Sequence, residues 1–525
     1  MSTPKGLVQF QNNYYLQAPE YVFFLSNSRY DCQYKYDLIS GLPISDSNAS
    51  CKRNYTYDSF GRVVTESVEL SGSPRRHATF RYSFLGKLLE KTDFFGHSTK
   101  YHYDSMGRLQ EIDETVSGTH TTTTIDYDVF SRPYKYTTNR GSDTAEIELS
   151  FNALGLETQR VAHFNGTEEF SIVQEFNIRQ LLAQRIFIDA QGQTVETFTY
   201  DDLARLNSYD CQGIHAPLDK YGNKITSQSF VYDLHDNVLN VTSNFDGGSS
   251  NITTFQYLPS NPHRLDSLTN TRYYPRFMRF RYDAAGNLLN DEQIRVYEYN
   301  ILNQLSSVAS SDGHQISQYA YDARGRVVSQ TVEDNLLDLF YLGDKLSNEL
   351  CGEQHTSLQG LAPGLLVRTV DCAGDQLHQF MLGNSQGSVI ETLSTNTTNT
   401  RDKETRRYTP YGEDKSISDT AHYNNGQSIL HPSPFGFNGE RQDPVTKLYP
   451  LGNGYRSYSP VLTRFASYDS ASPFGDYGIN GYSYCLGDPL NYRDPSGHFL
   501  SILVGAVVGA VVGAAVSATT EVVKT

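Results

Sequence analysis

The stretch YDSFGRVV at residues 57–64 decides the fold, because its pattern returns along the chain as YDSMGRL at 103–109 and YDARGRVV at 321–328. The shared form is a tyrosine, an aspartate, two variable residues, a glycine, an arginine and an apolar residue. In these three copies the repeated residues are Tyr57, Asp58, Gly61 and Arg62; Tyr103, Asp104, Gly107 and Arg108; and Tyr321, Asp322, Gly325 and Arg326.

Each copy has the chemistry of a β-hairpin. The tyrosine ends one strand, the aspartate can accept hydrogen bonds from its own turn, the glycine tolerates a positive φ, and the apolar residue begins the return strand. Degenerate copies begin at Tyr82, Tyr127, Phe151, Phe176, Tyr200, Tyr232, Tyr257, Tyr282 and Tyr299. Most successive copies are about 21 to 25 residues apart, which argues against unrelated turns scattered through a β-sandwich.

Stacked hairpins predict an all-β protein. One hairpin is marginal in water, but a stack covers both the aromatic faces and the sheet edges. The composition agrees, with 38 Tyr, 27 Phe, 40 Gly, no Trp and 19% charged residues. Since strands twist, a sheet of about a dozen hairpins should coil into a spiral or shell.

Charge and cysteine content exclude other classes. The net charge of −16 offers no basic stripe, so no nucleic-acid partner is expected. The six cysteines lie far apart, without CxxC pairs or zinc-like histidine spacing, so we expect buried thiols, no metal site and no cofactor. Residues 1–17 lack the pattern of a signal peptide, which predicts synthesis in the bacterial cytoplasm.

The repeats resemble the YD or RHS repeats of polymorphic bacterial toxins and of the C components of insecticidal toxin complexes. Residues 434–498 look like the RHS-associated core of those proteins, since they contain GYRSYSP, TRFASYD, NGYSY and DPSG in the family's order. The resemblance implies a hollow β-shell, or cocoon, that encloses the chain's own C-terminal segment as cargo. It also implies a second, B-component-like shell protein as partner, and secretion or release as part of a toxin complex.

This resemblance divides the chain into five parts. We expect N-terminal strands that cap or join the shell at 1–50, the repeat array at 51–345, further shell strands at 346–433, the core with an aspartyl autoprotease at 434–498, and an apolar glycine-zipper tail, a toxin leader or remnant, at 499–525.

The core also implies a chemistry, at most a single-turnover intramolecular aspartyl protease. Matched motif to motif, its catalytic residues are Arg456, Asp469 and Asp494, and the bond cut is His498–Phe499. Two neighbouring carboxylates share a proton, so one can activate water while the other protonates the carbonyl. Outside this motif the same aspartates would be read as turn formers. The family usually has Leu where this chain has His498.

The tail beyond the predicted cut carries no recognisable toxin. From Phe499 to Ala518 it holds no charge, and Gly505, Gly509 and Gly513 form a stripe that allows close helix packing. It is long enough for a membrane-spanning helix. We favour an apolar leader packed against the inner wall of the shell, and expect membrane contact only through 499–518.

The leading hypothesis is a toxin-encapsulating, self-cleaving RHS shell protein. Two alternatives stay open: a cell-surface adhesion or carbohydrate-binding module, and a decayed RHS toxin that lacks its effector.

Overall fold

The computed structural model describes residues 2–3, 6–12, 16, 18–24, 30–272, 275–372, 374–396, 401–415, 433–469, 480–498 and 501–502. Phe499, the three tail glycines Gly505, Gly509 and Gly513, and most of the helix expected at 499–518 lie outside these residues. The described pair Ser501–Ile502 forms strand β40, because its backbone pairs with β39 (Tyr492–Arg493), where the sequence predicted a helix.

The first sheet has 24 strands, and each pairs antiparallel with the next one in the chain. Its strands are β1 (Ser2–Thr3), β2 (Gly6–Asn12), β3 (Pro19–Phe24), β4 (Cys32–Tyr36), β5 (Pro43–Ser47), β6 (Cys51–Tyr57), β7 (Val63–Leu70), β8 (Arg76–Tyr82), β9 (Leu88–Thr92), β10 (Ser98–Tyr103), β11 (Leu109–Val116), β12 (Thr119–Tyr127), β13 (Pro133–Arg140), β14 (Asp143–Phe151), β15 (Glu157–Phe164), β16 (Thr167–Phe176), β17 (Leu182–Asp189), β18 (Gly192–Tyr200), β19 (Leu206–Gly213), β20 (Ile225–Tyr232), β21 (Val238–Phe245), β22 (Ser250–Leu258), β23 (Asn261–Asn270) and β24 (Phe277–Arg279).

A second sheet of 11 strands follows with the same topology. Its strands are β25 (Val296–Tyr299), β26 (Leu305–Ala309), β27 (Gln315–Tyr321), β28 (Val327–Val332), β29 (Asn335–Leu342), β30 (Lys345–Cys351), β31 (Gln354–Ala362), β32 (Leu365–Cys372), β33 (Asp375–Gly383), β34 (Val389–Asn396) and β35 (Arg401–Thr405). The predicted all-β fold of stacked hairpins is confirmed.

The repeat motif builds its turn with the side chains that the sequence singled out. In the turn after β6, Oδ1 of Asp58 accepts the backbone N–H groups of Phe60 and Arg62, while Oδ2 accepts Nε of Arg62 at 2.7 Å. Gly61 lies at φ 78°, a conformation that disfavours a side chain. The same aspartate–arginine pairs occur at Asp104–Arg108 and Asp322–Arg326.

Tyrosine hydroxyls tie several hairpins to the one before them. Tyr103 donates to the backbone carbonyl of Leu88 at 2.8 Å, and Tyr321 donates to that of Leu305 at 2.7 Å. The strand pairing shifts register immediately before each of these tyrosines, as at a β-bulge. The motif therefore specifies both the turn and the contact between neighbouring repeats.

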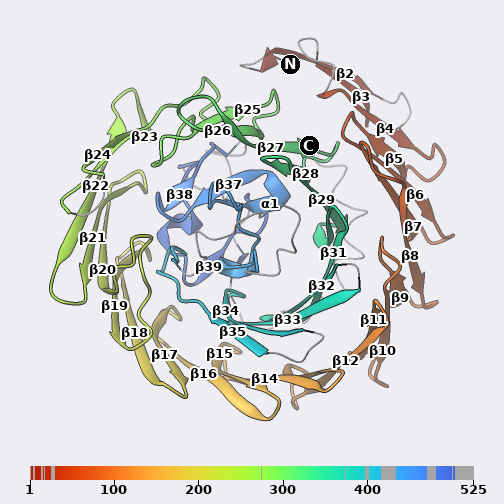
Figure 1. Ribbon diagram of the computed structural model, residues 1–525, viewed down its shortest axis with the longest axis horizontal. Coiled ribbons are helices and arrows are strands. Elements are labelled where there is room, and N and C mark those ends of the chain that lie inside the picture. Colours follow the sequence, from red (N-terminus) through yellow and green to blue (C-terminus); the bar gives the residue numbers. More distant parts are fainter. Residues whose placement is uncertain are drawn as a thin grey trace.

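The sheets coil as a spiral around a common centre (Figure 1). The first sheet forms the outer ring, the strands from β27 to β35 lie inside it, and the C-terminal core occupies the middle. Hydrogen bonds join the rings: the Asn348 amide donates to Asp93 at 2.7 Å, and Arg160 donates to the carbonyl of Pro363 at 2.8 Å. The shell is thus lined by the chain's own second sheet.

One hydrophobic cluster links all three parts. It contains Ile147 of the first sheet, Phe380 of the second and Tyr458 of the core, each buried. A cavity of about 770 Å³ remains between the second sheet and the core, reaching from Leu305 to Ser496. The interior is mostly filled by packed chain.

The core holds short elements and turns. They are a 3-10 turn η2 (Phe437–Gly439), β36 (Tyr449–Pro450), α1 (Leu451–Gly454), β37 (Arg456–Ser459), β38 (Arg464–Phe465), a 3-10 turn η3 (Cys485–Gly487), β39 and β40. No helix in the described part of the chain is long and apolar enough to span a membrane.

Candidate active site

Three core segments bring Arg456, Asp469 and Asp494 together. Arg456 begins β37, Asp469 follows β38, and Asp494 follows β39. Nη2 of Arg456 lies 3.1 Å from Oδ2 of Asp469 and 3.6 Å from Oδ2 of Asp494. The two carboxylates therefore face one guanidinium nitrogen.

Arg456 is fixed on its remaining sides. Its Nη1 donates to the backbone carbonyl of Gly481 at 2.8 Å, its Nε donates to the carbonyl of Gly497, and its guanidinium lies 3.7 Å from the ring centre of Phe465. The residue is only 5% exposed. A charged group so deeply buried needs these partners, which also set the position of the nitrogen between the aspartates.

The DPSG turn shapes the other side of the cluster. Ser496 donates its hydroxyl to Asp494 at 3.0 Å and accepts the backbone N–H of His498 at 3.0 Å. Gly452 approaches this turn so closely that a Cβ atom there would lie 2.1 Å from the carbonyl oxygen of Ser496. A side chain at position 452 would displace Ser496, whose hydroxyl contacts Asp494.

His498 folds back onto the cluster from this turn. Its Nδ1 lies 3.2 Å from Oδ1 of Asp469, and its ring stacks on that of Tyr455 with centroids 3.6 Å apart. The Tyr455 hydroxyl also donates to Asp469, at 3.4 Å. The residue before the predicted cut is thereby held against one of the two carboxylates.

Burial and charge act in opposite directions on the two acids. Asp469 and Asp494 are 3% and 4% exposed. Burial raises the pKa of Asp494, and the nearby Arg456 charge offsets only part of this effect. Burial also lowers the pKa of Arg456. With one guanidinium facing two buried carboxylates, a shared proton is the arrangement with the least uncompensated charge.

The chain on both sides of the predicted cut is anchored. After His498 it returns as β40, which pairs with β39 through Tyr492–Ile502 and Arg493–Ser501. The bond from His498 to Phe499 thus lies in the connection between two paired strands. Chemically, two buried carboxyl groups are the kind of groups that acid–base hydrolysis of a peptide bond uses.

The sequence named the arginine, the two aspartates and His498, and the structure brings these four residues together. Their catalytic role stays a prediction. The sequence did not predict that Tyr455 and the backbone carbonyls of Gly481 and Gly497 would also contact this cluster. Tyr455 carried one signal, since it stands directly before Arg456 in the GYRSY motif, whereas backbone carbonyls leave no sequence signal.

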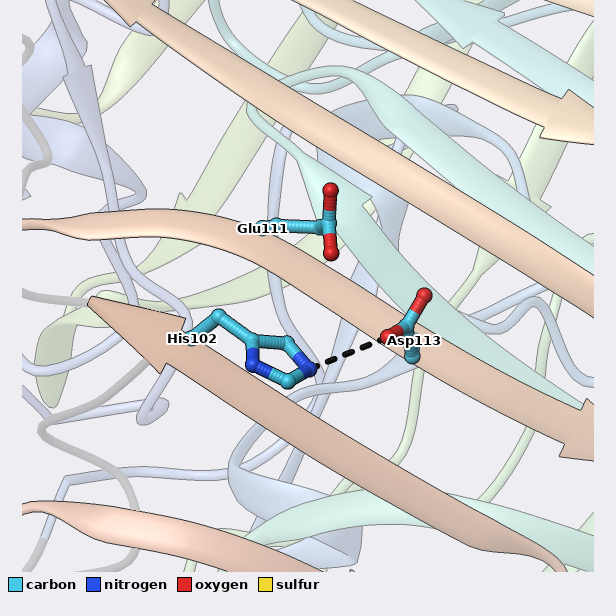
Figure 2. Close-up of side chains that lie close together, drawn as sticks. All are labelled: His102, Glu111 and Asp113. Carbon is cyan, nitrogen blue, oxygen red and sulfur yellow. Dashed lines mark hydrogen bonds and ion pairs between the residues drawn. The ribbon is translucent and has the colours of Figure 1, made fainter. Parts of the chain in front are cut away.

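A different cluster has donors suited to a metal ion. His102 of β10 and Glu111 and Asp113 of β11 offer ligand atoms that all lie within 4.8 Å of one another on the outer sheet (Figure 2). His102 Nε2 lies 3.0 Å from Oδ2 of Asp113, and His102 is 52% exposed at its side chain. Strand pairing makes this group, so spacing along the sequence did not reveal it. It lies apart from the core that holds Arg456.

A comparison with protein-family models identifies the repeat shell. The family model of the Teneurin YD-shell matches residues 135–477, which include Arg456 and Asp469. The tRNA3(Ser)-specific nuclease WapA of Bacillus spizizenii is 23% identical over 284 residues, which make up 53% of this chain and 11% of that protein. The chain therefore spans a small part of this curated relative.

Solved structures of toxin complexes also match. The crystal structure of TcdB2-TccC3-Cdc42 aligns with 95% of this chain and 28% of its own, at 14% identity and a TM-score of 0.48. A structure of the Photorhabdus luminescens Tc holotoxin pore aligns with 93% of this chain and 28% of its own, at 13% identity and a TM-score of 0.47.

Proposed function

The chain belongs to the Teneurin YD-shell family, and from this premise we propose that it is a shell protein of a bacterial toxin system that encloses its own C-terminal segment and cuts it free at the His498–Phe499 bond. The observation that carries the proposal is the buried cluster in which Asp469 and Asp494 face one nitrogen of Arg456.

The two acids have separable roles. Asp469 is the base, because Arg456 lies closer to it than to Asp494, and His498 also contacts it. Asp494 carries the shared proton, because burial raises its pKa. The proton is still a property of the coupled pair, so the two apparent pKa values belong to both acids.

Hydrolysis then balances in two steps. Water attacks the carbonyl carbon of His498 while Asp469 takes a water proton and Asp494 gives its proton to the carbonyl oxygen. The tetrahedral intermediate collapses as Asp469 protonates the nitrogen of Phe499 and Asp494 recovers a proton from a hydroxyl group. The C–N bond breaks, and both acids return to their starting states.

A second shell-forming chain completes the enclosure. Among the described strands, β1 pairs only with β2, so the first sheet has an open edge at its N-terminal end. Open edges are sites where another chain can add strands. Release as part of such an assembly accounts for a toxin component that is made in the cytoplasm.

Self-cleavage is tested by the intact mass of the purified protein. The wild type should lose the 27 residues from 499 to 525, whereas Asp494→Asn should retain them. Asp488→Asn is the matched control, because Asp488 is also a buried core aspartate, 2% exposed, but serves a turn by accepting the N–H groups of Leu490 and Asn491. A tail that stays covalently attached in both the wild type and the control rejects the proposal.

A further inference from the structure

The two rims of the outer sheet differ in chemistry. In an antiparallel meander, alternate turns lie at opposite ends of the strands. The turns that carry the YD motif make one rim, and the turns between successive repeats make the other. Several turns at this second rim hold small or polar residues, as at Ser117-Gly118, Asn165-Gly166 and 246–248 (DGG). The second rim has apolar residues at two places, the turn at 93–97 (DFFGH) and the connection at 214–222 (IHAPLDKYG).

Nine consecutive YD turns, from residues 37–42 to 233–237, each expose an apolar side chain at the tip. We call these twelve residues the apolar rim. They are Leu38, Ile39, Phe60, Phe84, Leu85, Met106, Val129, Phe130, Leu154, Ile178, Leu203 and Leu234, with relative exposures between 59% and 101%.

The turns do not require apolar residues at these positions. The aspartate, the glycine and the arginine make the turn, as the contacts of Asp58 and Arg62 show. Phe60 lies over the guanidinium group of Arg62 at 5.0 Å, and Phe130 lies over that of Arg132 at 5.1 Å. The apolar tip side chains nevertheless take no part in the hydrogen bonds of the turn, so a contact outside the wall would account for nine of them in succession.

Two neighbouring tips of the apolar rim are in contact. The rings of Phe60 and Phe84, from adjacent repeats, contact each other edge to face with centroids 5.8 Å apart. Each such side chain presents on the order of 100 Å², so the rim presents about 1,000 Å². A typical monomer exposes no patch above roughly 600 Å², and a stable interface buries about 800 Å² per partner.

We propose that the apolar rim joins two copies of this chain, rim to rim. Each repeat contributes two strands, so successive tips are about 10 Å apart along the rim. An identical rim has the same spacing, which lets tips from the two copies interdigitate along the whole array. A two-fold axis then relates the copies, as in most homodimers.

This inference goes beyond the proposed function, because the second copy contacts the turn tips and not the sheet edge at which a second shell protein would add strands. The dimer would close one mouth of each shell against the other. It requires no self-cleavage, so oligomeric state and cleavage can be scored separately in the same preparations.

The test is the mass in solution of the full chain, measured by light scattering after size exclusion from about 1 to 50 μM. We expect twice the monomer mass of 59.0 kDa, unchanged at high salt because the contact is apolar. The double variant Phe84→Asp, Phe130→Asp should be a monomer that still folds, since these side chains are 83% and 75% exposed. Its thermal unfolding should shift only slightly, through loss of the contacts of Phe84 with Phe60 and of Phe130 with Arg132. The control Leu336→Asp, 47% exposed in the second sheet, should remain a dimer.

Three results overturn the proposal. The wild type could be a monomer over the whole concentration range, or the Phe84, Phe130 variant could remain a dimer. The third is a wild type that stays monomeric alone and instead floats with phosphatidylcholine vesicles, which would assign the rim to a membrane.

Discussion

At the scale of single residues, proton sharing between Asp469 and Asp494 sets the expected pH dependence of cleavage. Burial raises the pKa of Asp494, so this carboxyl keeps its proton at pH values where exposed aspartates have lost theirs. As the pH rises above that pKa, the pair loses its shared proton. At low pH the base, Asp469, becomes protonated as well.

Cleavage should therefore be fastest on the acidic side of neutrality and fall about tenfold per pH unit on the alkaline limb. The measurement is the rate of tail release after refolding of denatured, uncut protein in buffers from about pH 4 to 9. A rate that climbs steadily to pH 9 would contradict the assignment of the proton to Asp494.

Part of the site could be predicted from the sequence and part could not. Arg456, Asp469 and Asp494 stand in recognisable motifs, so their grouping could be predicted from resemblance. The stacking of His498 on Tyr455 could not, because it depends on how the DPSG turn points the chain back toward β37. The metal-donor cluster of His102 was missed for a related reason, since only strand register brings its residues together.

At the scale of the hairpin, the tyrosine hydroxyl couples one repeat to the previous one. Tyr321→Phe removes the bond to the Leu305 carbonyl and leaves that buried acceptor unpaired. We expect a loss of about 1–2 kcal/mol in the free energy of unfolding, measured by urea titration. Tyr134→Phe, at an exposed tyrosine of β13, should change it by less than about 0.5 kcal/mol. Equal effects of the two changes would contradict the role of the Tyr321 hydroxyl in coupling neighbouring repeats.

Hairpins could be predicted because their signals are local. An aspartate, a glycine and an arginine within five residues define the turn in the three full copies, and the structure uses them in that way at Asp58 and Asp322. The inner coil could not be predicted, because contacts such as Asn348 to Asp93 join residues far apart in sequence. No local pattern shows that one part of a repeat array will lie inside another.

At the scale of the whole molecule, the spiral should unfold as one unit. Repeats in a linear array contact only their neighbours, but here the core and both sheets share a hydrophobic cluster. Tyr458 is fully buried, stacks on Tyr484 at 3.9 Å and donates to the carbonyl of Tyr411. Tyr458→Ala should cost about 3–5 kcal/mol, as for other large buried rings.

Hydrogen exchange distinguishes shared from local stability. We expect Tyr458→Ala to lower amide protection in β14 to β18 of the outer sheet as well as in the core. Loss of protection confined to residues 433–498 would contradict this prediction, because it would mean that the outer sheet is stable without the core. A double variant with Tyr321→Phe would show whether the effects add.

The position of the core at the middle of the spiral also relates its assembly to the order of translation. Ribosomes make the outer wall before the centre, at roughly 5–20 residues per second. Residues 456, 469 and 494 all follow the outer sheet, whose last strand ends at Arg279, so the acid pair cannot assemble on a nascent chain that has only its wall. The order of translation therefore delays any self-cleavage until the outer sheet has been synthesised.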